Sequence, residues 1–130
     1  MTGNVTDFAT SKRLAKVWPF AKSPIECRFW AVSPEEKEYL RNGCAGQRRD
    51  GVWHDVTDGC LVYPARDLSE LEAKIREMKL RGNIYISAID ISCVLLAEED
   101  VIRGGEANTI INALGAAVAK ALEAAAEGEK

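Results

Sequence analysis

The residues of this 130-residue chain that are best suited to holding an anion are arginines near glycines or aromatic rings. One group begins at Arg103, continues through Gly104 and Gly105, and ends with Asn108 and Thr109. Glycines at a helix entrance let backbone N–H groups point at a ligand, and the helix dipole favours an anion there. The run is neither a GxGxxG motif nor a P-loop, so plain turn chemistry stays open as the alternative interpretation.

A second group places arginines beside aromatic rings in the first half of the chain. Its members are Arg28, Phe29, Trp30, Arg48, Arg49 and Trp53, all of them except Phe29 being predicted ligand contacts. A guanidinium group can grip a phosphate while an aromatic ring stacks on a base. The alternative is that Phe29 and Trp30 belong to the core and that the arginines are solvated. The two groups together are the predicted ligand site, and whether they share one cavity is left open.

Acid–base and metal chemistry have less support. His54, the single histidine, lies beside Asp55 with Asp58 nearby, which makes a hydrolase centred on His54 the third hypothesis. No nucleophile or oxyanion partner accompanies it. The cysteines form no C-x-x-C and, with one histidine, no zinc-ligand spacing; they are Cys27, Cys44, Cys60 and Cys93. We therefore expect no enzymatic activity, no catalytic residues, no metal and no cofactor.

The elements that must position these residues begin with two Ser-Pro-x-Glu motifs, at Ser23 and Ser33. Each is typical of a capped helix start, so the sequence predicts short helices over about 24–31 and 34–42. Residues 12–20 read as either a short helix or an entering strand. After an exposed loop over 43–51, alternating residues in 52–56 and 60–63 predict a β-hairpin.

The second half of the chain reads more regularly. Asp67-Leu68-Ser69-Glu70 is a capping box that opens an amphipathic helix ending near Gly82. Residues 84–96 are β-branched and apolar, which predicts one long central strand. A long alanine-rich helix is expected over about 106–126, and its small residues favour a subunit interface. The prediction is one α+β domain over 1–130, with a small antiparallel or mixed sheet and frayed ends at 1–8 and 127–130.

Charge and hydropathy limit the function classes. The net charge is −3, yet residues 1–49 hold nine Lys/Arg and five Asp/Glu. A net negative chain is a poor general nucleic-acid binder, while a local basic patch still suits a small anion. No stretch approaches the ~18 apolar residues of a membrane span. We expect a soluble, cytoplasmic protein with no membrane partner.

The segment Trp18-Pro19-Phe20 through Ser23-Pro24-Ile25-Glu26 to Phe29-Trp30, with a strand and a long helix at the C-terminus, resembles the viral sponge family called Thoeris anti-defence, type one. The resemblance covers the chain in outline and carries no ligand contacts residue by residue. It implies a homo-oligomer that binds cyclic ADP-ribose-type signals without cleaving them.

The leading functional hypothesis is therefore a phage or mobile-element anti-defence protein that sequesters a cyclic nucleotide immune signal in the host cytoplasm. It would hold a small phosphorylated nucleotide and assemble through its C-terminal helix. The alternative is a protein-binding inhibitor of a defence complex, such as an anti-CRISPR, that uses the acidic residues after position 49. Those residues are spread and paired along helices, which argues against nucleic-acid mimicry.

Overall fold

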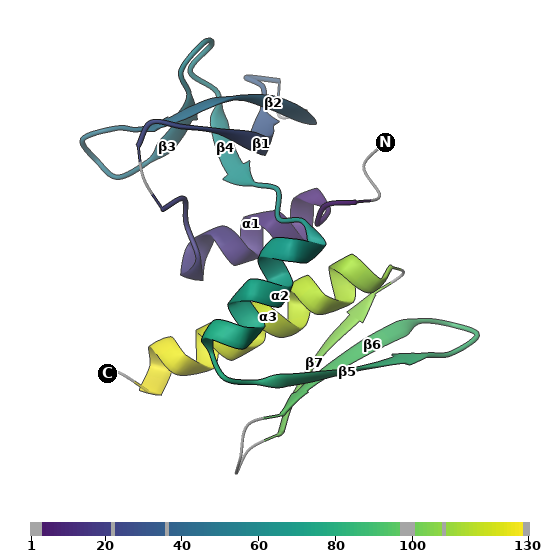
Figure 1. Cartoon of the computed structure of the whole chain (residues 1–130). Helices are drawn as coiled ribbons and strands as arrows, with labels where there is room; N and C mark the ends of the chain where they lie inside the picture. Colours follow the sequence, from purple (N-terminus) through teal and green to yellow (C-terminus); the bar gives the residue numbers. More distant parts are fainter. Residues whose placement is uncertain (1–3, 22, 36, 97–100, 108, 129–130) are drawn as a thin grey trace.

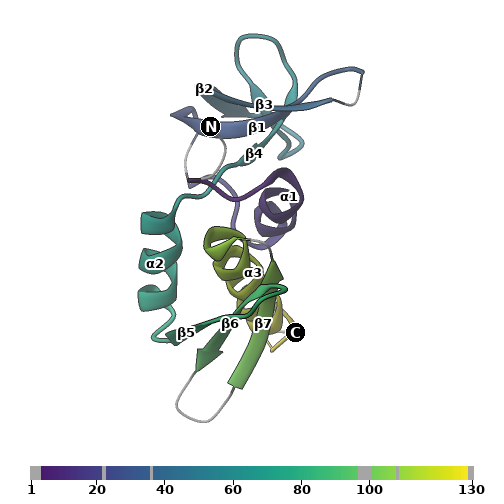
Figure 2. The ribbon, with the colours of Figure 1, turned by 90° about the vertical axis from the view of Figure 1, so that its right-hand side faces the viewer.

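The computed structural model describes residues 4–21, 23–35, 37–96, 101–107 and 109–128. Within these ranges, three helices lie between a four-stranded barrel and a separate three-stranded antiparallel sheet (Figure 1). Figure 2 shows the same order from the side, with the barrel at one end and the sheet at the other. The predicted α+β class is confirmed.

The barrel consists of β1 (Ile25–Val32), β2 (Glu38–Gln47), β3 (Trp53–Asp55) and β4 (Leu61–Pro64). β1 pairs with both β2 and β4, and β3 joins β2 to β4, all antiparallel. Alternate residues of β1 face the interior, where the buried apolar side chains are Phe20, Phe29, Ala31, Ala45 and Val62. The hairpin predicted from the alternating segments is confirmed as β3 and β4.

The helices predicted over 24–31 and 34–42 are wrong, because these segments form β1 and β2. Both serines do accept a backbone N–H, but within strand and turn structure. Ser23 Oγ accepts from the Gln47 amide at 2.8 Å, and Ser33 Oγ accepts from the Lys37 amide at 3.2 Å in the β1–β2 turn. A helix cap contributes about 1 kcal/mol, whereas burying one Phe side chain contributes roughly 1.5–3 kcal/mol. Burial of Phe29 in the barrel therefore outweighs the capping preference.

The first helix, α1 (Phe8–Val17), resolves the ambiguity over residues 12–20 in favour of a helix. Its N-cap is Asp7, whose side chain accepts from the Thr10 amide at 2.8 Å. The residues before it are tied down, since Val5 and Thr6 are buried and the Thr6 amide donates to Arg66 O. The fraying predicted for residues 1–8 is wrong for these two positions.

The helix predicted from the capping box is confirmed as α2 (Leu68–Glu77). The Asp67 side chain accepts from the Glu70 amide at 2.9 Å, and Glu70 reaches back to the Asp67 amide at 3.5 Å. Leu71 and Ile75 face the core. The chain leaves the helix at Lys79, which has a φ of 59°, rather than at Gly82, which lies in the next strand.

The strand predicted over 84–96 is two strands, β5 (Arg81–Ile86) and β6 (Ile91–Leu96), and β7 (Val101–Ala107) completes the sheet. A tight turn separates β5 from β6. The Ser87 amide donates to Asp90 O at 2.9 Å, and Ser87 Oγ donates to Asp90 Oδ1 at 2.8 Å. Serine and aspartate thus make the turn without glycine or proline, which is why apolar patterning hides it.

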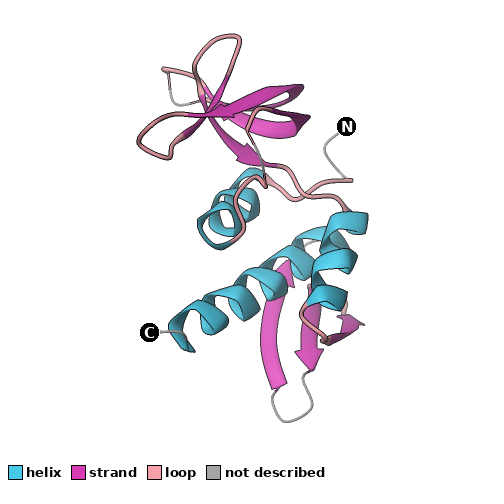
Figure 3. Cartoon of the chain, turned by 60° about the vertical axis from the view of Figure 1, so that its left-hand side comes forward, coloured by secondary structure: helices cyan, strands magenta, loops and turns pink. Residues whose placement is uncertain are grey.

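The C-terminal helix, α3 (Ile110–Gly128), starts later than predicted because 101–107 form β7. It packs against β6 and β7 on one side and against α1 and α2 on the other (Figure 3). Its small residues are already covered within the chain: Ala113 and Ala117 are fully buried, and a Cβ added at Gly115 would lie 2.7 Å from Thr10 Cγ2. In the part of the chain that is described, no helix has both the length and the apolar character needed to cross a bilayer.

Candidate functional site

The predicted anion site at the start of the last helix is wrong, because Arg103, Gly104 and Gly105 lie in the middle of β7. In the pairing with β6, Arg103 lies opposite Val94 and Gly105 lies opposite Cys93. Gly104 falls between these pairs as the extra residue of a β-bulge. The two glycines therefore belong to a bulged part of the strand and not to a phosphate-binding turn.

The remaining residues of that prediction also take other roles. Thr109 caps α3, since its hydroxyl accepts from the Asn112 amide at 3.3 Å. Asn112 in turn accepts from the Asp7 amide at 2.8 Å and so links α3 to the start of α1. Asn108 lies outside the described residues. The strand that carries Arg103 and the barrel that carries the other predicted residues lie on opposite sides of the helices (Figure 1).

The arginine and aromatic residues of the barrel are not brought together in one site. Trp30 is buried under Phe8, and its Nε1 donates to Thr6 O at 2.9 Å. Trp53 packs against Phe20 at a ring distance of 4.7 Å, in a different hydrophobic cluster. The interpretation of Trp30 as a core residue is the one that the structure supports.

The three arginines are also dispersed. Arg28 donates to Asn42 Oδ1 at 3.2 Å and to Asn4 Oδ1 at 3.1 Å. Arg48 donates to Gly59 O at 3.1 Å from the turn after β2, and Arg49 is exposed in that same turn. Of the predicted site residues that the structure describes, Trp53 alone lines the groove that we describe below as the candidate site.

A cavity of about 330 Å³ beside β1 contains Arg28 together with Cys27, Arg66, Asp67 and Glu70. Its positive charges are compensated, because Arg66 Nη1 lies 2.7 Å from Glu70 Oε2. Burial, with the Glu70 carboxylate nearby, raises the pKa of the Cys27 thiol to about 11. The thiol is therefore protonated at neutral pH and is a poor nucleophile. This cavity suits neither an anion nor covalent chemistry.

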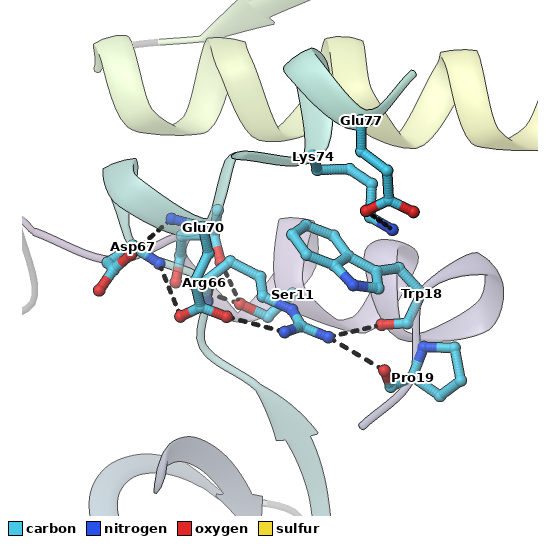
Figure 4. Close-up of polar contacts among 9 residues, drawn as sticks. Ser11, Trp18, Pro19, Arg66, Asp67, Glu70, Lys74 and Glu77 are labelled. Carbon is cyan, nitrogen blue, oxygen red and sulfur yellow. Dashed lines mark hydrogen bonds and ion pairs between the residues drawn. The ribbon is translucent and has the colours of Figure 1, made fainter. Parts of the chain in front are cut away.

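Arg66 itself is a structural link between the barrel and the helices (Figure 4). Its Nη2 donates to Trp18 O at 2.9 Å and to Pro19 O at 3.1 Å. Its guanidinium carbon lies 3.9 Å from the centroid of the Trp18 ring, and Lys74 Nζ lies 4.9 Å from that centroid. These contacts fix the end of α1 against the start of α2, so they position the neighbouring groove.

That groove, which we call the α1–barrel groove, lies between α1 and strands β3 and β4 and has a volume of about 350 Å³. Its wall contains the aromatic rings of Phe20, Trp53 and Tyr63. Val52 and Leu61 add apolar surface, with exposed fractions of 36% and 42%. A groove of this size and composition matches the small end of ligand-binding cavities, which begin at about 300 Å³.

The charge of the α1–barrel groove is positive on one side. Lys12 and Lys16, one turn apart on α1, are both exposed and both line it. Among the described residues that line it, none is an aspartate or a glutamate. Lysine ammonium groups next to apolar rings attract a ligand that is flat and apolar at one end and negatively charged at the other.

The polar residues around His54 have a structural role in the barrel. Asp55 is fully buried, and Arg41 Nη1 lies 2.9 Å from its Oδ2 without an N–H bond directed at that oxygen, so the contact is an ion pair. The same nitrogen lies 3.2 Å from Asp58 Oδ2. A buried carboxylate needs such a partner, which explains Arg41. No trio of His, Cys, Asp or Glu side chains gathers as a metal site within the described ranges.

Sequence reasoning missed Lys12, Lys16, Phe20 and Tyr63 as site residues. One signal was present: Lys12, Ala15 and Lys16 share a helical face on which two cations flank a small residue. The position of the β3–β4 hairpin opposite that face could not be inferred, because β1, which pairs with β4 and closes the barrel, is predicted as a helix. Searches of protein-family models, curated proteins and solved structures give no match to this chain.

Proposed function

We propose that this protein binds a small anionic ligand with a flat aromatic group, of the nucleotide class, in the α1–barrel groove. The observation that carries the proposal is the pairing of Lys12 and Lys16 with an aromatic wall whose described residues include no carboxylate. A base stacked near Trp53 would gain roughly 1–3 kcal/mol, and phosphate oxygens would lie toward the lysines.

The first test is isothermal titration with adenosine 5′-monophosphate and cyclic ADP-ribose as probes and adenosine as the uncharged control. Both phosphorylated probes should bind more tightly than adenosine. The double variant Lys12→Glu/Lys16→Glu should weaken binding of the phosphorylated probes more than about tenfold, which corresponds to 1.4 kcal/mol. Lys120→Glu, an exposed change of the same kind on α3, is the matched control.

The proposal fails if the charge-reversed variant binds the probes as tightly as the wild type. It also fails if no phosphorylated probe binds at all, which would favour the protein-directed inhibitor. Arg103→Glu should leave binding unchanged, because Arg103 lies in the sheet beyond the helices.

The narrower form of the proposal comes from the resemblance to the type one Thoeris anti-defence sponges. In this form, the ligand is a cyclic ADP-ribose-type immune signal that the protein sequesters intact in the host cytoplasm. Chromatography of ligand released from the protein after prolonged incubation tests this point. Recovery of unchanged cyclic ADP-ribose supports sequestration, whereas a converted product would contradict it and point to an enzyme.

A further inference from the structure

The outer edge of β5 is an exposed apolar strand edge. The sheet order β5-β6-β7 leaves β5 paired on one side with β6, and all six of its residues are exposed. Its large apolar side chains Ile84, Tyr85 and Ile86 have exposed fractions of 41%, 56% and 70%, and Ile89 in the following turn reaches 90%. Backbone groups and apolar side chains are thus offered together to a partner strand.

This edge has few of the features that normally protect edge strands. After Arg81, the first residue of β5, residues 82–89 contain no charged residue and no proline. Monomeric proteins guard such edges with charges, prolines or bulges. The opposite edge strand, β7, has charges and a bulge but no proline. Its sequence includes Arg103 and Glu106, and Gly104 forms the bulge. The contrast indicates that the β5 edge is covered by a partner.

A groove of about 400 Å³ runs beside the β5 edge, between α2 and α3. Two charged residues, Glu72 and Arg76, line it together with the apolar residues Leu68, Ile75, Leu80, Ile84, Ile110 and Leu114. Gly82 lies in the same groove, and a Cβ placed there would meet Leu95 Cδ2 alone, at 3.4 Å. The groove therefore has room for a large apolar side chain opposite Gly82.

We propose that two copies of this chain associate by antiparallel pairing of β5 with β5 about a two-fold axis at Ile84. In this register, Ile86 of each copy lies opposite Gly82 of the other. Both residues share the sheet face of Cys93, because Gly82 pairs with Leu95 and Ile86 with Ile91. Each Ile86 then enters the apolar groove of the second copy, and the two sheets become one six-stranded sheet.

A second copy fits this edge better than an unrelated partner because the edge is complementary to itself. Arg81 lies at one end of β5, and Asp90 lies across the turn at the other end. Antiparallel pairing brings the basic end of one copy beside the acidic end of the other. This surface is separate from α3, whose small residues are covered by α1, and it is independent of the α1–barrel groove.

The test is the molar mass by light scattering at micromolar chain concentrations. The wild type should be a dimer, and Ile86→Lys should be a monomer because it replaces the apolar side chain that would fill the groove with a long charged one. Val56→Lys, at an apolar barrel residue that is 55% exposed, is the matched control and should remain dimeric. Ile86 is itself 70% exposed, so circular dichroism should show an intact fold in both variants.

The register has its own test. Ile84→Cys should form an intermolecular cross-link with a short bifunctional thiol reagent, since facing Cβ atoms in such pairs lie ≈ 4.5–5.5 Å apart. Val56→Cys and the wild type should not. A monomeric wild type, a dimer that persists in Ile86→Lys, or an Ile84→Cys variant that does not cross-link would each overturn the proposal.

Discussion

Replacing Gly115 by alanine should destabilise the protein, although alanine is the better helix former. A Cβ at this position would lie 2.7 Å from Thr10 Cγ2 and 2.8 Å from Thr6 Cγ2. Both distances are shorter than any normal carbon–carbon contact. Thr6 cannot rotate away freely, because it is fully buried and its hydroxyl lies 2.7 Å from Ser11 Oγ in a hydrogen bond. The clash therefore has to move α1 relative to α3.

Two opposing terms set the size of the effect. Glycine to alanine inside a helix gains about 1 kcal/mol of helix propensity. Overpacking a well-packed interior costs typically 1–3 kcal/mol, and two simultaneous clashes with branched side chains belong at the upper end. The net loss is then about 2 kcal/mol, and the melting temperature should fall by roughly 8 °C in a chain of this length.

Thermal and urea unfolding followed by circular dichroism measures this loss. Ala124→Gly, at an exposed position of the same helix, calibrates the propensity term and should cost about 1 kcal/mol. Thr10→Ser removes the nearer methyl group, so Gly115→Ala/Thr10→Ser should recover about half of the loss. A Gly115→Ala variant as stable as the wild type would refute the close packing of α1 on α3.

Two further predictions concern the region around Arg66. Arg66→Met should lower the free energy of unfolding by about 3 kcal/mol, because it leaves two carbonyl groups and the Glu70 carboxylate without their partner. The matched control Arg49→Met, at an exposed position, should lower it by less than about 0.5 kcal/mol. If urea unfolding gives equal losses for the two variants, the Arg66 contacts contribute nothing to stability. For Cys27, the folded-state pKa of about 11 lies above the ordinary 9.0, so its contribution to stability is complete below pH 9 and is lost as the pH rises from 9 to 11. Alkylation of Cys27 should be slow at pH 8 and accelerate up to about pH 11, and a Cys27→Ala variant should lose less stability over that range; fast labelling at pH 8 would contradict the buried thiol.

Local signals predicted the structure where local and tertiary preferences agree. The capping box at Asp67 opens α2 because Leu71 and Ile75 on the same helix also find a core to enter. The hairpin of β3 and β4 is also found, although burial follows the expected alternation in β4 and not around β3, where Asp55 is buried and Val52 and Val56 are exposed. At α2 the hydrophobic period and the terminal motif indicate the same element, so one sequence is sufficient to recognise it.

The same signals failed where a capping motif and burial compete. Ser23 accepts a hydrogen bond from a backbone amide of a strand, and Ser33 accepts one from a backbone amide in a turn. In the sequence, neither role can be distinguished from helix capping. The turn at Ser87 has no glycine or proline, so two strands looked like one. The candidate site was predicted least well, because the α1–barrel groove joins residues from α1 and from β4 that only the closed barrel brings together.

The helix layer between the barrel and the sheet has a consequence for any assembly of this protein. The proposed ligand groove lies between the barrel and α1, and the edge proposed for self-association belongs to the sheet on the other side of α3. Because the two-fold axis of the proposed antiparallel pairing is perpendicular to the sheet, two joined copies would carry both helix layers on one face of the six-stranded sheet. Both grooves would then lie on that same side, so one dimer would present two ligand sites in the same direction.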